Sequence, residues 1–227
     1  MSLRPTGDAM SAYVTARANM IEGQIRPNKV TDERVIAAFA RIRRELFVPE
    51  ALRGVAYVDQ DLPLGAGRCL MQPMVAARMI QAAMINAEDT VLVVGAGAGS
   101  EAAVAAVLGR SVVALEENGE LARSGRAALV EHRIPNVAFV EGPLPAGHRQ
   151  RAPYEVILFA GAVADIPAEI AAQLGEGGRM VAVIKDAGGV GRATLTTRTG
   201  GVLARRAMFD AATPLLPGFS AKPAFVF

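Results

Sequence analysis

A glycine-rich turn carries the strongest chemical signal in the sequence. The stretch VLVVGAGAGSEAAVAAVLG places Gly95, Gly97 and Gly99 between a short apolar run and an alanine-rich run. Glycines at the start of a helix let the main chain approach a ligand closely and leave free amides pointing outward. We therefore expect Gly95, Ala96, Gly97 and Gly99 to wrap a cofactor. The alternative is a tight turn between strand and helix that binds nothing.

A carboxylate follows at the spacing where doubly wound folds hold a ribose. Glu116 ends the next apolar run, about 20 residues after Gly95. A carboxylate there accepts hydrogen bonds from ribose hydroxyls, which dinucleotides and S-adenosylmethionine both carry. The dinucleotide pattern G-x-G-x-x-G has Ser100 in place of its third glycine, which favours S-adenosylmethionine. A nicotinamide-dependent oxidoreductase stays an alternative, as does a solvated Glu116 at a helix start.

The elements that must position these residues alternate in type. Continuous apolar runs are typical of strands buried on both faces, and five occur: VLVV, VVAL, VAFV, VILFA and RMVAVI. Helical stretches at 100–108, 118–131 and 166–174 separate them, so a parallel, doubly wound α/β sheet is expected. ATLTTRTGGVLARRAMF then predicts an antiparallel edge hairpin that turns at Gly200 and Gly201. The apolar end, PLLPGFSAKPAFVF, fits docking on the chain's own core or on a partner chain.

The N-terminal part has a different pattern, helical and without a good strand up to about Met84. TDERVIAAFARI predicts a helix with Thr31 as its N-cap. The apolar face of this helix comprises Val35, Ile36, Phe39 and Ile42. A later loop rich in glycine and proline leads into a helix opened by Pro73 and is placed to fold over a neighbouring site. We expect residues 1–84 to form a helical extension with a substrate-side loop, and 85–227 to form one compact cofactor-binding domain.

Composition limits the classes of function. The 227 residues are 52% hydrophobic and 20% charged, as in a globular protein. The net charge is only +2 and the arginines are dispersed, which argues against a nucleic-acid surface. One cysteine, Cys69, excludes an internal disulfide and disfavours a thiolate metal site, and no apolar run reaches the roughly 18 residues of a membrane span. We expect a cytoplasmic protein without metal or membrane contact, with His132 and His148 at its surface.

Several blocks of the sequence, in order, resemble one family. They are MIEGQIRPNKVTDERVIAAFARIRRELFVPEAL, AYVDQDLPLGAGRCLMQP, VLVVGAGAG and APYEVILFAGAVADIPAEIAAQLGEGGRMVAVI. Together they are similar to the protein-L-isoaspartate O-methyltransferases. The resemblance implies a class I methyltransferase fold, S-adenosylmethionine as cofactor and the isoaspartyl carboxylate of a damaged protein or peptide as substrate. A carboxylate is already a nucleophile at neutral pH, so its methylation needs alignment more than a strong base.

The resemblance also implies roles for individual residues. Glu116 would hold the ribose, and Gly142 with Leu144 would flank the adenine. The acceptor pocket would be lined by Leu70, Met71 and Gln72. No side chain is assigned as catalytic, because Met71 stands where the family's T-I-S-Q-P-like stretch has its serine.

Three further positions depart from the family's pattern. Val93 replaces the carboxylate of V-L-E-I-G, Pro143 replaces the aspartate of G-D-G, and Ser100 replaces an aromatic residue. Loss of that aspartate would leave the adenine amino group unpaired, at a cost of about 1 to 3 kcal/mol. These changes support a second hypothesis, a non-catalytic or acceptor-switched relative that serves as a binding or partner module. In it, Met71, Val93 and Pro143 would fill the pocket.

Overall fold

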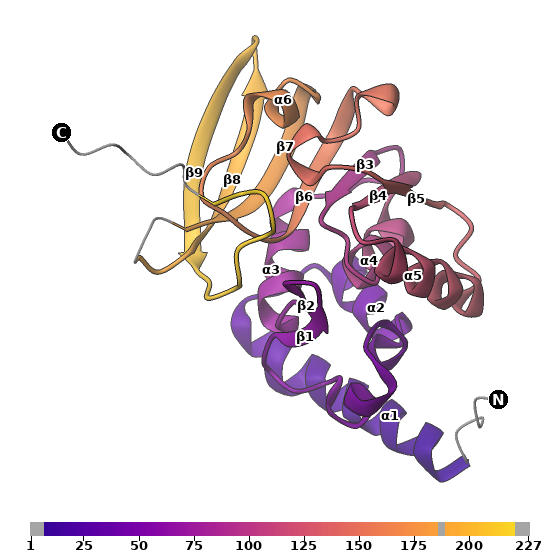
Figure 1. Ribbon diagram of the computed structural model, residues 1–227. Coiled ribbons are helices and arrows are strands. Elements are labelled where there is room, and N and C mark those ends of the chain that lie inside the picture. The colour runs from indigo at the N-terminus through magenta and orange to yellow at the C-terminus, as the bar shows by residue number, and fades with distance from the viewer. Residues whose placement is uncertain (1–6, 186–188, 221–227) are drawn as a thin grey trace.

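A seven-stranded sheet organises the molecule (Figure 1). The computed structural model describes residues 7–185 and 189–220. The strands lie in the order β5-β4-β3-β6-β7-β8-β9. Their bounds are β3 Thr90–Val94, β4 Ser111–Glu116, β5 Val137–Glu141, β6 Tyr154–Val163, β7 Leu174–Ile184, β8 Arg192–Thr199 and β9 Val202–Asp210. Strands β3 to β7 pair in parallel, and β8 and β9 add antiparallel, which confirms the predicted mostly parallel sheet with a C-terminal edge hairpin.

The order of the strands reverses at β3. This strand pairs with β4 on one side and with β6 on the other. The connections that leave the carboxyl ends of these strands therefore diverge, and the glycine loop begins directly after Val94. In open α/β sheets ligands bind in the crevice outside such a point. The predicted cofactor loop thus lies where the topology favours a site.

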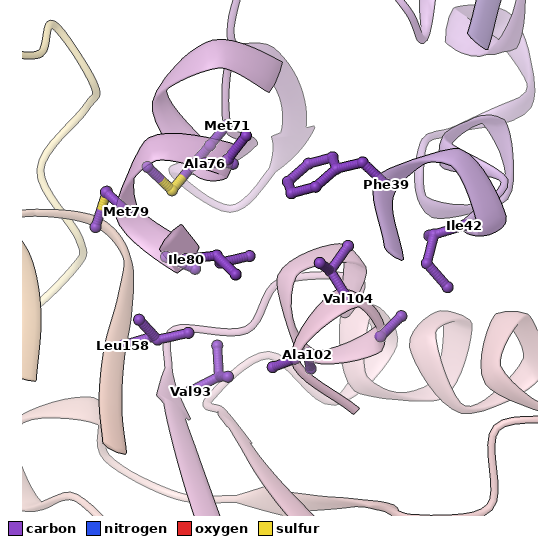
Figure 2. Packing of buried hydrophobic residues seen from close by; sticks show 14 of the residues in the cluster. Phe39, Ile42, Met71, Ala76, Met79, Ile80, Val93, Ala102, Val104 and Leu158 are labelled. Atoms are coloured by element: carbon purple, nitrogen blue, oxygen red, sulfur yellow. The ribbon is translucent and has the colours of Figure 1, made fainter. Parts of the chain in front are cut away.

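One face of the sheet is covered by helices that form the main core. Helices α3 (Pro73–Ala83), α4 (Ser100–Leu108) and α5 (Gly119–His132) lie on the sheet, α2 (Glu33–Arg41) packs on α3 and α4, and α1 (Gly7–Met20) lies farther out. Figure 2 shows Phe39 of α2, Ile80 of α3 and Ala102 of α4 converging above Val93 and Leu158 of the sheet. The predicted apolar face of the helix at 33–41 is buried here, as are the methionines Met71 and Met79 (Figure 2). The N-terminal helices therefore share a core with the sheet.

The opposite face has a thinner cover and a second core. The cover consists of the single-turn helix α6 (Ala168–Ala171), a 3-10 turn at Leu144–Ala146 and the segment Pro214–Phe219. The predicted helix at 166–174 is wrong in length, because the chain enters β7 at Leu174. Leu216 N–H donates to the carbonyl of Ala162 over 2.8 Å. The described part of the apolar C-terminal segment thus docks on its own sheet, while 221–227 lie outside the described residues.

The N-terminal extension contains a hairpin that the sequence did not predict. Strands β1 (Leu62–Gly65) and β2 (Arg68–Leu70) pair antiparallel in a small sheet of their own. Strand β1 has four residues, which include a proline and a glycine, and β2 has three. Strands this short show no recognisable alternation of apolar and polar residues. The remaining extension consists of short turns at Ile21–Ile25, Arg26–Asn28, Arg44–Phe47 and Glu50–Val55. The N-cap of α2 is Asp32 and not Thr31, since its side chain accepts from Arg34 N–H.

Candidate functional site

The glycine loop adopts a conformation that requires its glycines. Gly95, Gly97 and Gly99 have φ values of +72°, +55° and +93°, in the left-handed region that residues with a side chain rarely adopt. All residues from Gly95 to Ser100 are buried. Gly95 and Ala96 both donate to the carbonyl of Leu115 over 2.9 Å, and Gly99 donates to Ala96. The expectation of free outward amides is therefore wrong for these groups, which are used within the chain.

Glu116 lies against this loop and is fully buried. Its Oε2 accepts from Gly97 N–H over 2.7 Å and from Arg68 Nε over 3.2 Å. Its Oε1 accepts from the N–H groups of Glu117 and Asn118 over 3.0 and 3.1 Å. An ionised carboxylate offers about four lone-pair sites, so these donors saturate it. The alternative of a solvated Glu116 is wrong, and the exposed neighbour is Glu117.

Arg68 is the residue of this site that sequence reasoning missed. It comes from β2, and its side chain is 1% exposed beside the fully buried Glu116. Its Nη2 also donates to the carbonyl of Gly95. The only signal in the sequence was a cation within the apolar stretch that ends at Met71. The sequence pattern did not indicate where the Arg68 side chain would point, because its orientation depends on the hairpin, which was not predicted.

Side chains of this chain occupy the space in front of the glycines. A Cβ placed on Gly95 would lie 2.6 Å from Arg68 Nη2 and 3.0 Å from both methyl groups of Leu216. A Cβ on Gly97 would lie 3.1 Å from Leu64 Cδ1. All acceptor sites of Glu116 are thus occupied by donors of the protein, and side chains fill the space in front of the glycines. In the conformation described, the crevice between loop and acid does not fit the ribose of a nucleoside cofactor.

The predicted adenine-side residues lie in two different environments. Gly142 N–H donates to the carbonyl of Glu116 over 3.2 Å, so Gly142 borders the crevice. Leu144 is fully buried in the second core. Pro143 between them is exposed and fills no pocket, which contradicts that part of the second hypothesis. Val93 does not reach the crevice either, because its side chain points into the main core toward Ala102 (Figure 2).

The predicted acceptor-side residues lie where the hairpin ends, since Leu70 is the last residue of β2 and Met71 and Gln72 follow it. Leu70 and Met71 are each 1% exposed, and Gln72 is half-buried with its N–H donating to Asp61 Oδ1 over 2.6 Å. Met71 lines a cavity of about 10 Å³ together with Leu158 and residues of α3. That volume holds roughly one water molecule. A larger hollow of about 310 Å³ lies elsewhere, between 164–168 and Gly218–Ser220, beyond the end of β6.

Two buried charges beside Met71 were also missed. Glu101, the second residue of α4, lines the same cavity, and its Oε1 has no hydrogen-bond partner among the described residues. Burial raises the pKa of this carboxyl. Arg44 donates to the carbonyls of Ala56 and Met71, while its Nη1 is without a partner in the described part of the chain. Burial lowers the pKa of Arg44 to about 10, against the opposing effect of Glu101.

Cys69 lies in β2 between Arg68 and Leu70, and the two histidines lie on other parts of the chain. His132 and His148 are both partly exposed and partly covered by neighbouring residues. His132 stacks on Phe47 at 5.2 Å and accepts from Arg43 N–H, and burial lowers its pKa. Burial raises the pKa of the Cys69 thiol to about 11, so it is protonated at neutral pH. Within residues 7–185 and 189–220, His, Cys, Asp and Glu form no group of three suited to a metal, and no helix has the length and apolarity to cross a bilayer.

The fold and loop define the class. A parallel sheet that reverses at β3, a glycine loop after that strand, an acid at the end of β4 and an antiparallel edge hairpin are the features of a class I methyltransferase fold. A family model described as Protein-L-isoaspartate(D-aspartate) O-methyltransferase (PCMT) matches residues 15–206. The chain therefore belongs to this family, whose members are S-adenosylmethionine-dependent O-methyltransferases.

Individual relatives agree with this assignment. The chain is 40% identical over 172 residues to a protein-L-isoaspartate O-methyltransferase of Koribacter versatilis, covering 76% of this chain and 78% of the relative. It is 40% identical over 171 residues to that of Herpetosiphon aurantiacus, covering 75% and 76%. A solved protein-L-isoaspartate O-methyltransferase superposes with a TM-score of 0.77 at 24% identity, over 89% of this chain and 66% of that one. A Plasmodium falciparum structure in complex with S-adenosyl-L-homocysteine gives 0.73 at 15% identity, over 90% and 97%.

Proposed function

We propose that this chain is an S-adenosylmethionine-dependent O-methyltransferase that methylates isoaspartyl carboxylates in damaged proteins or peptides. Family membership supports the activity. The observation that carries the proposal is the placement of Glu116, which ends β4 with its carboxylate 2.7 Å from the N–H of Gly97. In this proposal residues 1–84 supply the substrate side and 85–227 bind the cofactor. The protein then acts from a form in which the crevice is more open than in the structure described.

The proposal assigns a part to each region of the site. Main chain at Gly95, Ala96, Gly97 and Gly99 lies along the cofactor's amino-acid end, Glu116 holds the ribose, and Gly142 with Leu144 marks the adenine side. The stretch Leu70, Met71 and Gln72 faces the acceptor. No side chain is proposed as a base, because an acceptor carboxylate needs none. The chain's contribution is to orient the two reactants and to exclude water around them.

A methyl-transfer assay with a peptide that contains one isoaspartyl residue tests this function. The expected result is transfer of labelled methyl to that peptide and none to the same peptide with ordinary aspartate. Glu116→Gln should reduce the transfer strongly, while Glu117→Gln, an exposed neighbour, should leave it unchanged. Equal labelling of both peptides, or no labelling by a protein that binds the cofactor, would contradict the assignment of the acceptor.

One observation favours a second candidate, a non-catalytic member of the family that serves as a binding or partner module. The crevice is filled by Arg68 and Leu216 and its acid is saturated. This candidate predicts neither binding of S-adenosylmethionine nor methyl transfer. Calorimetric titration with S-adenosylmethionine and S-adenosyl-L-homocysteine separates the two candidates, because saturable heat is expected only from the enzyme.

A further inference from the structure

We propose that Arg68 and Leu216 are internal occupants of the nucleoside crevice, and that the cofactor binds only by displacing them. This inference rests on the proposed function, since it concerns the regulation of the same site. The two residues come from distant parts of the chain: β2 of the small hairpin, and the segment that follows β9. The tips of these two segments also approach each other, since a Cβ on Gly67 would lie 3.5 Å from Pro217 Cγ.

Arg68 takes the place of a ligand in terms of charge and hydrogen bonds. Its guanidinium donates both to Glu116 Oε2 and to the carbonyl of Gly95, and thus spans the acid and the loop. A ribose hydroxyl needs an acceptor site on this carboxylate, and the other three sites are filled by main-chain N–H groups of the same loop and strand end. Main-chain donors are held by the fold. Arg68 is therefore the one donor whose departure frees the acid.

Leu216 takes the place of a ligand in terms of volume. Its side chain is 2% exposed and lies against two glycines, Gly95 of the loop and Gly161 of β6. A Cβ on Gly161 would clash with Leu216 Cδ2, so the leucine can occupy this position only because residue 161 is a glycine. Two hydrogen bonds with Ala162, one from Leu216 N–H and one to the carbonyl of Pro214, fix the segment along β6. The main chain of this segment is thus tied to β6, so the displacement that we propose concerns the side chain of Leu216.

The element that carries Arg68 has fewer strand neighbours than the element that carries Glu116, although its leucines pack in the main core. Among the described residues, strands β1 and β2 pair with each other and with no third strand, and their turn at 65–67 is exposed. A two-stranded hairpin of this length is marginally stable by itself. Glu116 ends a strand that pairs on both sides in the seven-stranded sheet. An incoming nucleoside would therefore lift Arg68 away and leave Glu116 where it is.

Binding of S-adenosyl-L-homocysteine to a small set of variants tests the inference. Arg68→Gln removes the cation and Leu216→Ala removes the apolar occupant. The matched controls are Arg192→Gln, an exposed ion-pair arginine, and Leu174→Ala, which is equally buried in the second core but away from the crevice. Because an occupied crevice reduces apparent affinity by the fraction of open molecules, each test variant should bind about tenfold tighter or more than the wild type. The controls should bind like the wild type.

The outcomes separate this inference from the proposed function. Test variants that bind no tighter than the wild type would overturn it, and so would a complete lack of binding in all proteins at millimolar ligand, because other groups would then close the crevice. Tighter binding without methyl transfer to the isoaspartyl peptide would leave the inference intact and refute the function. If Arg68→Gln does not fold, Arg68→Lys is informative, since lysine keeps the charge but lacks the fork that reaches acid and loop together.

Discussion

Two regions of this molecule each contain a buried arginine and a buried glutamate. The hydrogen-bonding atoms of the glutamate all have partners in one region, whereas both residues have atoms unpaired within the described chain in the other. In the crevice, Arg68 and Glu116 bind each other, and the carboxylate has a donor at each of its four sites. Beside the Met71 cavity, Glu101 Oε1 and Arg44 Nη1 are both without partners among the described residues.

The difference shows what each region can still bind. The Glu116 carboxylate, with a donor at every acceptor site, can accept a hydrogen bond from a ligand only after one of these donors moves away. An unsatisfied buried carboxylate is costly, and the low dielectric of its surroundings makes any donor that reaches it effective. The crevice at the glycine loop is thus closed by side chains of the protein itself, whereas the cavity beside Met71 keeps unpaired polar atoms and has room for about one water.

The largest expected effect comes from breaking the satisfied pair. Glu116→Gln should lower the free energy of unfolding by about 3 to 5 kcal/mol, because it leaves the charge of Arg68 buried and uncompensated. Urea unfolding followed by circular dichroism measures this loss. A loss below about 1 kcal/mol would show that the pair is more hydrated in solution than its burial indicates.

A smaller loss is expected from crowding the crevice. Gly95→Ala places a methyl group against Arg68 and Leu216 at a residue with φ +72°. The strained backbone alone costs about 1 to 2 kcal/mol, and the contacts add to that cost. Gly142→Ala is the matched control, since its Cβ would meet only Leu115 at 3.7 Å and should change the unfolding free energy by less than about 0.5 kcal/mol. Equal effects of the two substitutions would mean that the crevice is not filled.

The unpaired carboxyl of Glu101 should make the free energy of unfolding depend on pH. Burial raises the pKa of folded Glu101 above its ordinary value of 4.5, so its contribution to stability is present below pH 4.5 and is lost as pH rises through the folded pKa. The unfolding free energy of wild type minus that of Glu101→Gln should therefore fall as pH rises from 4 to 8. Each unit of pKa elevation adds about 1.4 kcal/mol to this change. A flat difference over that range would refute the assignment of an unpaired carboxylate.

The smallest effect is expected outside both regions. Glu141 pairs with Arg126 over 3.0 Å, and both side chains are about half exposed. Glu141→Gln should change the unfolding free energy by less than about 1 kcal/mol, since water and salt screen such a pair. Comparing this variant with Glu116→Gln under the same conditions calibrates how much burial contributes to the larger loss. A loss as large as that of Glu116→Gln would undermine the distinction between exposed and buried pairs.

Much of the fold could be predicted because its signals are local. Each parallel strand is a continuous apolar run, and the turn of the edge hairpin has two glycines, Gly200 and Gly201, that both have positive φ as a two-residue turn demands. The hairpin of β1 and β2 was missed since its strands are too short to show alternation. The helix at 166–174 was overestimated because the alanine-rich pattern continues after the chain has turned toward β7.

The candidate site was predictable only where sequence spacing determines position. Gly95 to Gly99 and Glu116 are placed by neighbouring strands, so their distance along the chain implied their contact. Arg68 reaches Glu116 from 48 residues away, through tertiary packing of a hairpin. Leu216 lies on β6 because of a bridge between Leu215 and Ala162 that no local pattern encodes. The residues that fill the crevice were therefore invisible from the sequence, while the residues that form it were not.

The outer strand of the edge hairpin has a consequence for how the protein behaves at high concentration. Strand β9 ends the sheet with one row of main-chain groups unpaired within the described chain. Its middle carries two exposed arginines, Arg205 and Arg206. Charged side chains at such a position discourage another strand from adding to the row, so they guard against aggregation by sheet extension. The arginines of β9 thus disfavour pairing between the unpaired main-chain groups of two molecules, which could otherwise hydrogen-bond to each other.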